Sequence, residues 1–196
     1  FGSLSNWLGV FVLVVLSLYF YRSRKVRIFI FFRRRWRWVL LEEALFLLGL
    51  LFWSWVRGHQ PAINGLEKFM DFGFVNSILR SGYFPPSDMW LSGETINYYY
   101  FGHLLTAVIT RLSGLSSAVT YNLMIATIFG LVLSATFSLA TTLAHSLFAE
   151  PRSRSRKFRM AISGIVSAVV MVFAGNLHTV VTVLSKGAAN YWYPDA

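Results

Sequence analysis

The sequence predicts an all-α integral membrane protein: a polytopic helical bundle with a large outer loop. Hydrophobic residues make up 56% of its 196 residues, and only 13% are charged, which is about half the share in a soluble domain. The apolar residues gather in stretches close to the ~20 residues that a helix needs to cross a bilayer. Because lipid offers no hydrogen-bond partner to the backbone, such stretches must be helical.

Four apolar stretches are long enough for us to expect membrane-spanning helices. They are residues 4–21, 39–56, 119–148 and 161–184. The first is not typical of a signal peptide, because the basic residues follow it instead of preceding it. The chain begins with phenylalanine and has no tail-like composition at its end. We therefore expect residues 1–196 to be one transmembrane domain within a longer protein.

The basic residues lie mainly in two runs, at 22–37 and 152–159, and give the chain a net charge of +10. Both runs adjoin apolar stretches, which is typical of cytoplasmic loops that contact anionic lipid headgroups. We therefore expect membrane lipids as partners and no nucleic acid. The sequence identifies no protein partner.

One large outer loop, residues 57–118, follows from this topology. If both basic runs are cytoplasmic, residues 39–56 carry the chain to the outer side. The chain must then return before the second run, which takes an odd number of crossings, and 119–148 supplies one. Residues 98–112 are also apolar but are shorter than the ~17 residues needed to span, so we expect an interfacial helix. We also expect a short helix near 65–81. If 98–112 crosses the membrane instead, the second basic run lies outside.

Three runs in the outer loop carry a resemblance: GLEKFMDFGF at 65–74, FPPSDMW at 84–90 and GETINYYYFGH at 93–103. Together they resemble the "YYY" family of uncharacterised polytopic membrane proteins from archaea and some bacteria, named for the triplet of Tyr98, Tyr99 and Tyr100. The final WYPDA resembles another segment of that family. The resemblance covers residues 39–196 and implies no established chemistry.

The layout is more distantly similar to the GT-C membrane glycosyltransferases, which implies a GT-C-like N-terminal part. Those enzymes take a sugar from a polyprenyl-phosphate carrier at the outer face. They place one essential acid in the first outer loop and a second acidic motif after two more spans. By position, Asp71 matches the first acid and Asp195 the second, although a full Asp-x-Asp is not present at Asp195. The similarity implies a polyprenyl-phosphate-linked sugar donor as substrate.

Carboxylates in the outer loop are the candidate catalytic and metal-binding groups. Glu67 and Asp71 are four residues apart, so they share one face of a helix. They could bind Mg²⁺ or Mn²⁺, or divide acid and base roles between them, with Asp88 as a third ligand. A chain without cysteine offers no thiolate to zinc. The alternatives are a solvated helix face with Arg57 and Lys68 as ion partners, and a turn capped by Asp88.

Tyr98, Tyr99, Tyr100 and His103 are the candidate substrate-binding residues, together with Asp88 and Asp195. The tyrosines could form an aromatic wall for a sugar or an isoprenoid chain. On a helix they would point to different sides, so an interfacial aromatic belt is the alternative. A lone histidine in an apolar stretch can equally be a structural group.

Glu42 and Glu43 are expected to open the second spanning helix. Acids at that position complement the helix dipole and can pair with the preceding arginines. The alternative is an intramembrane proton relay.

Three functions remain open: an outer-face glycosyltransferase, a transporter subunit, or a non-catalytic scaffold. A transporter places ionisable residues near mid-membrane, whereas the expected spans have almost none at their centres. The acids of the outer loop therefore favour the enzyme. No nucleotide-binding or hydrolase motif is present in the sequence.

The topology can be tested with single cysteines, because the chain has none of its own. We expect an impermeant thiol reagent added to intact cells to label Ser87→Cys in the outer loop. Ser153→Cys, in the second basic run, should react only after the cells are opened. Labelling of both from outside would show that residues 98–112 cross the membrane.

Overall fold

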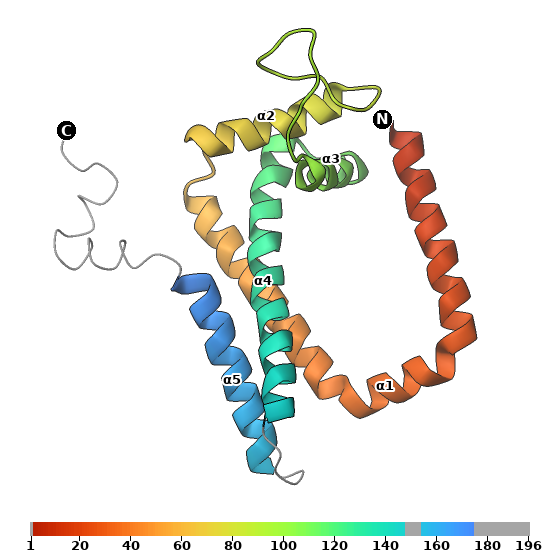
Figure 1. Ribbon diagram of the computed structural model, residues 1–196, viewed down its shortest axis with the longest axis vertical. Helices are drawn as coiled ribbons and strands as arrows, with labels where there is room; N and C mark the ends of the chain where they lie inside the picture. Colours follow the sequence, from red (N-terminus) through yellow and green to blue (C-terminus); the bar gives the residue numbers. More distant parts are fainter. Residues whose placement is uncertain (1, 148–153, 175–196) are drawn as a thin grey trace, which may run out of the picture. The chain divides into compact units, whose positions relative to one another are not determined.

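The computed structural model describes residues 2–147 and 154–174, and every named element within them is a helix (Figure 1). The helices are α1 (Ser3–His59), α2 (Leu66–Arg80), α3 (Phe101–Ser113), α4 (Ser117–Leu147) and α5 (Arg154–Phe173). Three segments in this part of the chain are long and apolar enough to cross a membrane: Ser3–Lys25, Arg27–His59 and Ser117–Leu147. The predicted fold class, an all-α membrane protein, is confirmed.

Helix α1 is continuous over 57 residues and includes the basic run that we expected to be a loop. Residues 22–37 contain neither glycine nor proline, so nothing in them breaks the helix. Glu42 and Glu43 consequently lie inside α1, far from its start at Ser3. The interpretation that they complement a helix N-terminus is therefore wrong.

Helices α2 and α3 correspond to two expected segments of the outer loop. Helix α2 confirms the short helix expected near 65–81. The expected interfacial helix at 98–112 begins three residues later, at Phe101, so Tyr98 and Tyr99 precede it. The expected span 161–184 overlaps α5, and its residues from 175 onward lie outside the described ranges.

The chain divides into two compact units. The first comprises Phe1–Val39 and Leu51–Thr127, and the second comprises Leu40–Leu50 and the residues from Ile128 onward.

The core of the first unit joins α2, α3 and the start of α4, which Figure 1 shows at one end of α4. Val75 and Ile78 of α2 are buried with Ala107 of α3 and Tyr121 of α4. The edge of the Phe72 ring also meets Tyr121, with 5.6 Å between ring centroids. These apolar contacts fix α2 against the other two helices, since burying a Val or Ile side chain contributes about 1.5–3 kcal/mol.

Close approaches at glycine hold the second unit together. Gly49 of α1 is buried against Gly130 of α4, and a β-carbon added at Gly130 would lie 2.7 Å from the carbonyl oxygen of Phe46. A β-carbon added at Gly164 of α5 would lie 2.6 Å from the Thr141 side chain and 2.7 Å from Phe137. Small residues that let helix backbones approach are typical of helix packing in membranes.

We expect Gly130→Ala to destabilise the protein by about 1–3 kcal/mol, because the added methyl group would overlap backbone atoms of α1. The matched control is Gly9→Ala on α1, where an added β-carbon meets no atom within 4 Å. There the gain in helix propensity should stabilise by about 0.5–1 kcal/mol. Thermal unfolding of the two variants in the same detergent measures the difference, and equal melting temperatures would contradict the close approach.

Candidate functional site

Asp71 and His103 form the central pair of the candidate site. The Nε2 atom of His103 lies 3.0 Å from Oδ1 of Asp71. A carboxylate can only accept a hydrogen bond, so Nε2–H is the donor. The Asp71 side chain is 38% exposed and that of His103 only 16%. The pair therefore presents a carboxylate to the surface, with an imidazole behind it.

Helix periodicity explains how two residues so far apart in sequence meet. Asp71 lies one turn before Val75 on α2, and His103 lies one turn before Ala107 on α3. Residues four apart share a helix face, and Val75 and Ala107 belong to the same buried core. Because α2 and α3 pack together at Val75 and Ala107, their side chains one turn earlier, Asp71 and His103, are also close.

A cluster of aromatic rings adjoins the pair at His103. The buried Phe74 ring lies edge-on to His103, with centroids 5.3 Å apart, and also contacts Tyr98 at 5.8 Å and Trp90 at 6.3 Å. Tyr98 stacks on Tyr99 at 4.0 Å, and its hydroxyl donates to the Tyr99 hydroxyl at 2.7 Å. Trp90 and Tyr99 are exposed, so the site has an accessible aromatic rim.

The environment of the Tyr98 hydroxyl favours its neutral form. The hydrogen bond to Tyr99 raises the pKa of Tyr98, with smaller contributions from burial and from the negative charges of Asp71 and Glu67. The phenol of Tyr98 therefore keeps its proton and donates it to the Tyr99 hydroxyl.

The tyrosine triplet does not lie on a helix, and the expectation that its rings point around one is wrong. Helix α3 begins only after it, with Tyr100 as its N-cap. Tyr100 packs against the core of the first unit and stacks on Phe84, with centroids 6.3 Å apart. Tyr98 and Tyr99 remain at the rim, so the triplet has two structural roles.

Asp88 organises the loop between α2 and α3. Its Oδ1 accepts hydrogen bonds from the backbone N–H groups of Trp90 at 2.7 Å and Leu91 at 3.0 Å. Its own N–H donates to the carbonyl of Glu94 at 2.9 Å. The backbone hydrogen bonds from Leu91 and Trp90 lower the pKa of Asp88 below its ordinary value of 3.8. This is the turn-capping role that the sequence left open.

The described residues do not assemble the divalent-cation site expected at Asp71, Glu67 and Asp88. Within 2–147 and 154–174, no group of three or more His, Asp or Glu side chains could hold a metal ion. Glu67 is exposed, and Asp88 bonds its own loop. Asp195, the last candidate residue, lies outside these ranges.

Arg57, a candidate ion partner of the helix face that carries Glu67, bonds Asn122 instead. Its guanidinium donates to Oδ1 of Asn122 on α4 at 2.5 and 2.9 Å and to the carbonyl of Ala62 at 3.2 Å. Asn122 donates in turn to the carbonyl of Pro61 at 3.0 Å. These bonds fix the segment between α1 and α2, and no sequence pattern predicted that this segment would contact Asn122.

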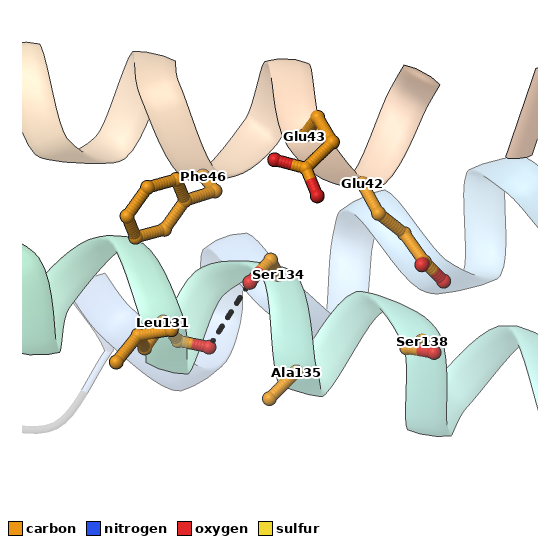
Figure 2. A pocket seen from close by; sticks show the side chains of 7 residues that line it. All are labelled: Glu42, Glu43, Phe46, Leu131, Ser134, Ala135 and Ser138. Carbon is orange, nitrogen blue, oxygen red and sulfur yellow. Dashed lines mark hydrogen bonds between the residues drawn. The ribbon is translucent and has the colours of Figure 1, made fainter. Parts of the chain in front are cut away.

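A separate pocket of about 380 Å³ lies within the second unit, between the Glu42 and Glu43 region of α1 and α4 (Figure 2). Figure 2 shows both glutamate side chains extending from α1 toward the residues of α4 that complete the lining. The α4 side contributes Ser134 and Ser138, and Ser134 donates to the carbonyl of Leu131 at 3.2 Å. The four-residue spacing of these serines was the sequence signal for this polar face, and we missed it.

The family comparison agrees with a membrane protein. A family model described as "Uncharacterized membrane protein (DUF2298)" matches residues 1–193. Neither a curated protein nor a solved structure matches the chain.

We expect Asp88→Ala to speed amide hydrogen exchange at Trp90 and Leu91, because both N–H groups lose their acceptor. The matched control is Glu94→Ala, which removes another acid from the same loop but leaves the Asp88 cap intact. Exchange measured by mass spectrometry on peptides covering 87–96 should rise only in the first variant. Equal rates in both variants would contradict the cap.

The cap should also respond to pH. Because the pKa of Asp88 is lower in the folded loop than in an unfolded chain, its stabilising contribution is present above about pH 4. It should disappear as the pH falls through the lowered pKa of the folded state. Exchange rates corrected for intrinsic pH effects should rise in that window for the wild type and stay level for Asp88→Ala. A level wild-type profile would contradict the assignment.

Proposed function

The chain belongs to the DUF2298 family of uncharacterised membrane proteins, and from that premise we propose that it is a membrane glycosyltransferase of GT-C type. Its donor would be a sugar linked to a polyprenyl phosphate, used at the outer face of the membrane. The observation that supports this most is the Asp71–His103 hydrogen bond of 3.0 Å beside an exposed aromatic rim. It supplies an accessible, oriented carboxylate in the loop region of a membrane protein.

Glycosyl transfer requires a base for the acceptor hydroxyl. The acceptor oxygen forms a bond to the anomeric carbon while the bond from that carbon to the phosphate oxygen breaks. The hydroxyl proton passes to Asp71, and the polyprenyl phosphate leaves with the electron pair. His103 keeps the carboxylate in one orientation by its hydrogen bond, and a positioned base of this kind contributes about 10²–10⁴ in rate.

The aromatic rim gives the proposed site a surface for sugar rings. Tyr99 is 76% exposed and Trp90 is 68% exposed. The buried Phe74 ring packs against Trp90 and Tyr98. Flat apolar faces with a polar edge suit a ligand that is partly apolar and partly hydroxylated. The Tyr98 hydroxyl donates its proton to the Tyr99 hydroxyl, and the Tyr99 hydroxyl adds a donor at the same place.

No step in this proposal passes through a divalent cation. The sequence suggested Mg²⁺ or Mn²⁺, but the described residues do not provide three oxygen ligands together. The residues that the mechanism uses are Asp71 as base and His103 as its positioning partner.

One observation favours a second function, a transporter subunit. Glu42 and Glu43 lie in the span-length segment Arg27–His59 and line the pocket with Ser134 and Ser138. Ionisable residues at membrane depth commonly mark an ion or proton pathway. If Glu42→Gln with Glu43→Gln abolishes cation or proton flux into proteoliposomes while Asp71→Asn does not, the transporter replaces the enzyme.

We expect Asp71→Asn to reduce sugar transfer by about 10²–10⁴, because the variant keeps the side-chain shape but cannot accept the proton. His103→Gln should cost less, since an amide N–H can still reach the carboxylate. The assay is radiolabelled sugar transfer from polyprenyl-phosphate donors by the full-length protein in reconstituted membranes, with folding checked by size-exclusion chromatography.

The matched control is Glu67→Gln, one turn before Asp71 on the same helix. This exposed side chain makes no hydrogen bond or ion pair with the described part of the chain, so the rate should fall less than threefold. A folded Asp71→Asn protein with the wild-type rate would remove Asp71 from the mechanism. A wild type inactive with all such donors would favour the transporter or the non-catalytic scaffold.

A further inference from the structure

Helix α3 turns an apolar stripe away from the protein. The stripe consists of Phe101, Leu105 and Ile109, which are 70%, 47% and 48% exposed. Their spacing of four residues keeps them on one side of the helix. None of them belongs to the buried core of the first unit.

The opposite side of α3 carries its polar groups and faces the protein. Thr110 is buried and shares a hydrogen bond of 2.6 Å with Thr120 of α4. His103 bonds Asp71, and Arg111 donates to the carbonyl of Leu79 on α2. Thr106, also buried, donates to the carbonyl of Gly102 within the helix at 3.1 Å. The side of α3 that faces the protein therefore combines these polar groups with the buried Ala107, whereas its outward side is apolar. On a water-soluble protein the outward side of a helix is polar.

We infer that α3 lies in the plane of the membrane surface, with Phe101, Leu105 and Ile109 in contact with lipid acyl chains. Its 13 residues give a length of about 20 Å, too short for the ~30 Å hydrocarbon core. An in-plane helix instead buries one apolar side at the boundary between headgroups and acyl chains.

The connection to α4 supports lipid as the occupant of this surface. Helix α4 is a candidate span and begins at Ser117, only a few residues after α3 ends at Ser113. Leu115, between the two helices, is 49% exposed, and Val119, in the first turn of α4, is 47% exposed. The end of α3 is therefore tied to the membrane end of a spanning helix, and exposed apolar residues continue from one helix to the other.

This placement has a consequence for the Asp71–His103 pair that does not depend on the reaction proposed above. His103 lies two residues after Phe101, on the side of α3 opposite the stripe. A helix with its side chains is about 10 Å wide. The pair therefore lies roughly one helix width from the acyl chains. The polar end of a substrate whose tail is anchored in lipid can reach it there, whereas a substrate buried wholly among the acyl chains cannot.

Fluorescence quenching in nanodiscs tests the inference, using the full-length protein with single cysteines labelled by bimane. Phe101→Cys and Ile109→Cys report the stripe. Leu139→Cys, 62% exposed on the candidate span, serves as the lipid control, and Ser92→Cys, exposed in the loop before α3, serves as the aqueous control. Quenchers are aqueous iodide and phospholipids with a nitroxide at a shallow or a deep acyl position.

We expect the two stripe labels to be quenched by shallow nitroxide lipid and shielded from iodide, with nearly equal depths. Iodide quenching as strong as at Ser92→Cys would place the stripe in water and overturn the inference. Shielding from both quenchers would show that protein covers the stripe and would overturn it as well. A depth difference near 12 Å, the distance between these residues along the helix axis, would mean that α3 enters the bilayer steeply and is not in plane.

Discussion

Val75 and Ile78 of α2 pack on Ala107 of α3 and Tyr121 of α4, and the first unit depends on this contact. Its apolar core sets the register between α2 and α3. Because Asp71 and His103 each lie one helical turn before a core residue, the same register brings their side chains within 3.0 Å. A shift of either helix by one residue would rotate one partner by about 100° and break the pair.

Polar contacts around this core hold the irregular segments in place. Arg57 and Asn122 fix the connection from α1 to α2, and Ser77 of α2 donates to the carbonyl of Ser87 in the following loop. Asp88 closes the turn within that loop. The acids of this region thus differ in their contacts: Asp88 bonds its own backbone, whereas Asp71 bonds His103 and stays partly exposed.

Two acidic settings among the described residues correspond to the two proposed functions. Asp71 lies in the loop region with a histidine partner, while Glu42 and Glu43 lie in a span-length helix and line a pocket with serines. The first setting suits proton transfer at a membrane surface, and the second suits the passage of a cation or proton. The proposed glycosyltransferase would use Asp71 and His103, whereas the proposed transporter would use Glu42 and Glu43.

The sequence by itself determined the all-α membrane class and the short helix at α2, because backbone groups in lipid must bond internally and apolar length is read directly from the chain. It also singled out Asp71 and His103 as separate candidates. Only the tertiary structure decided that they form a pair, that Asp88 caps a turn, that Tyr98 and Tyr99 precede α3, and that α1 continues through its basic run. These features depend on contacts between residues distant in sequence, or on where a helix starts and stops, and local pattern specifies neither.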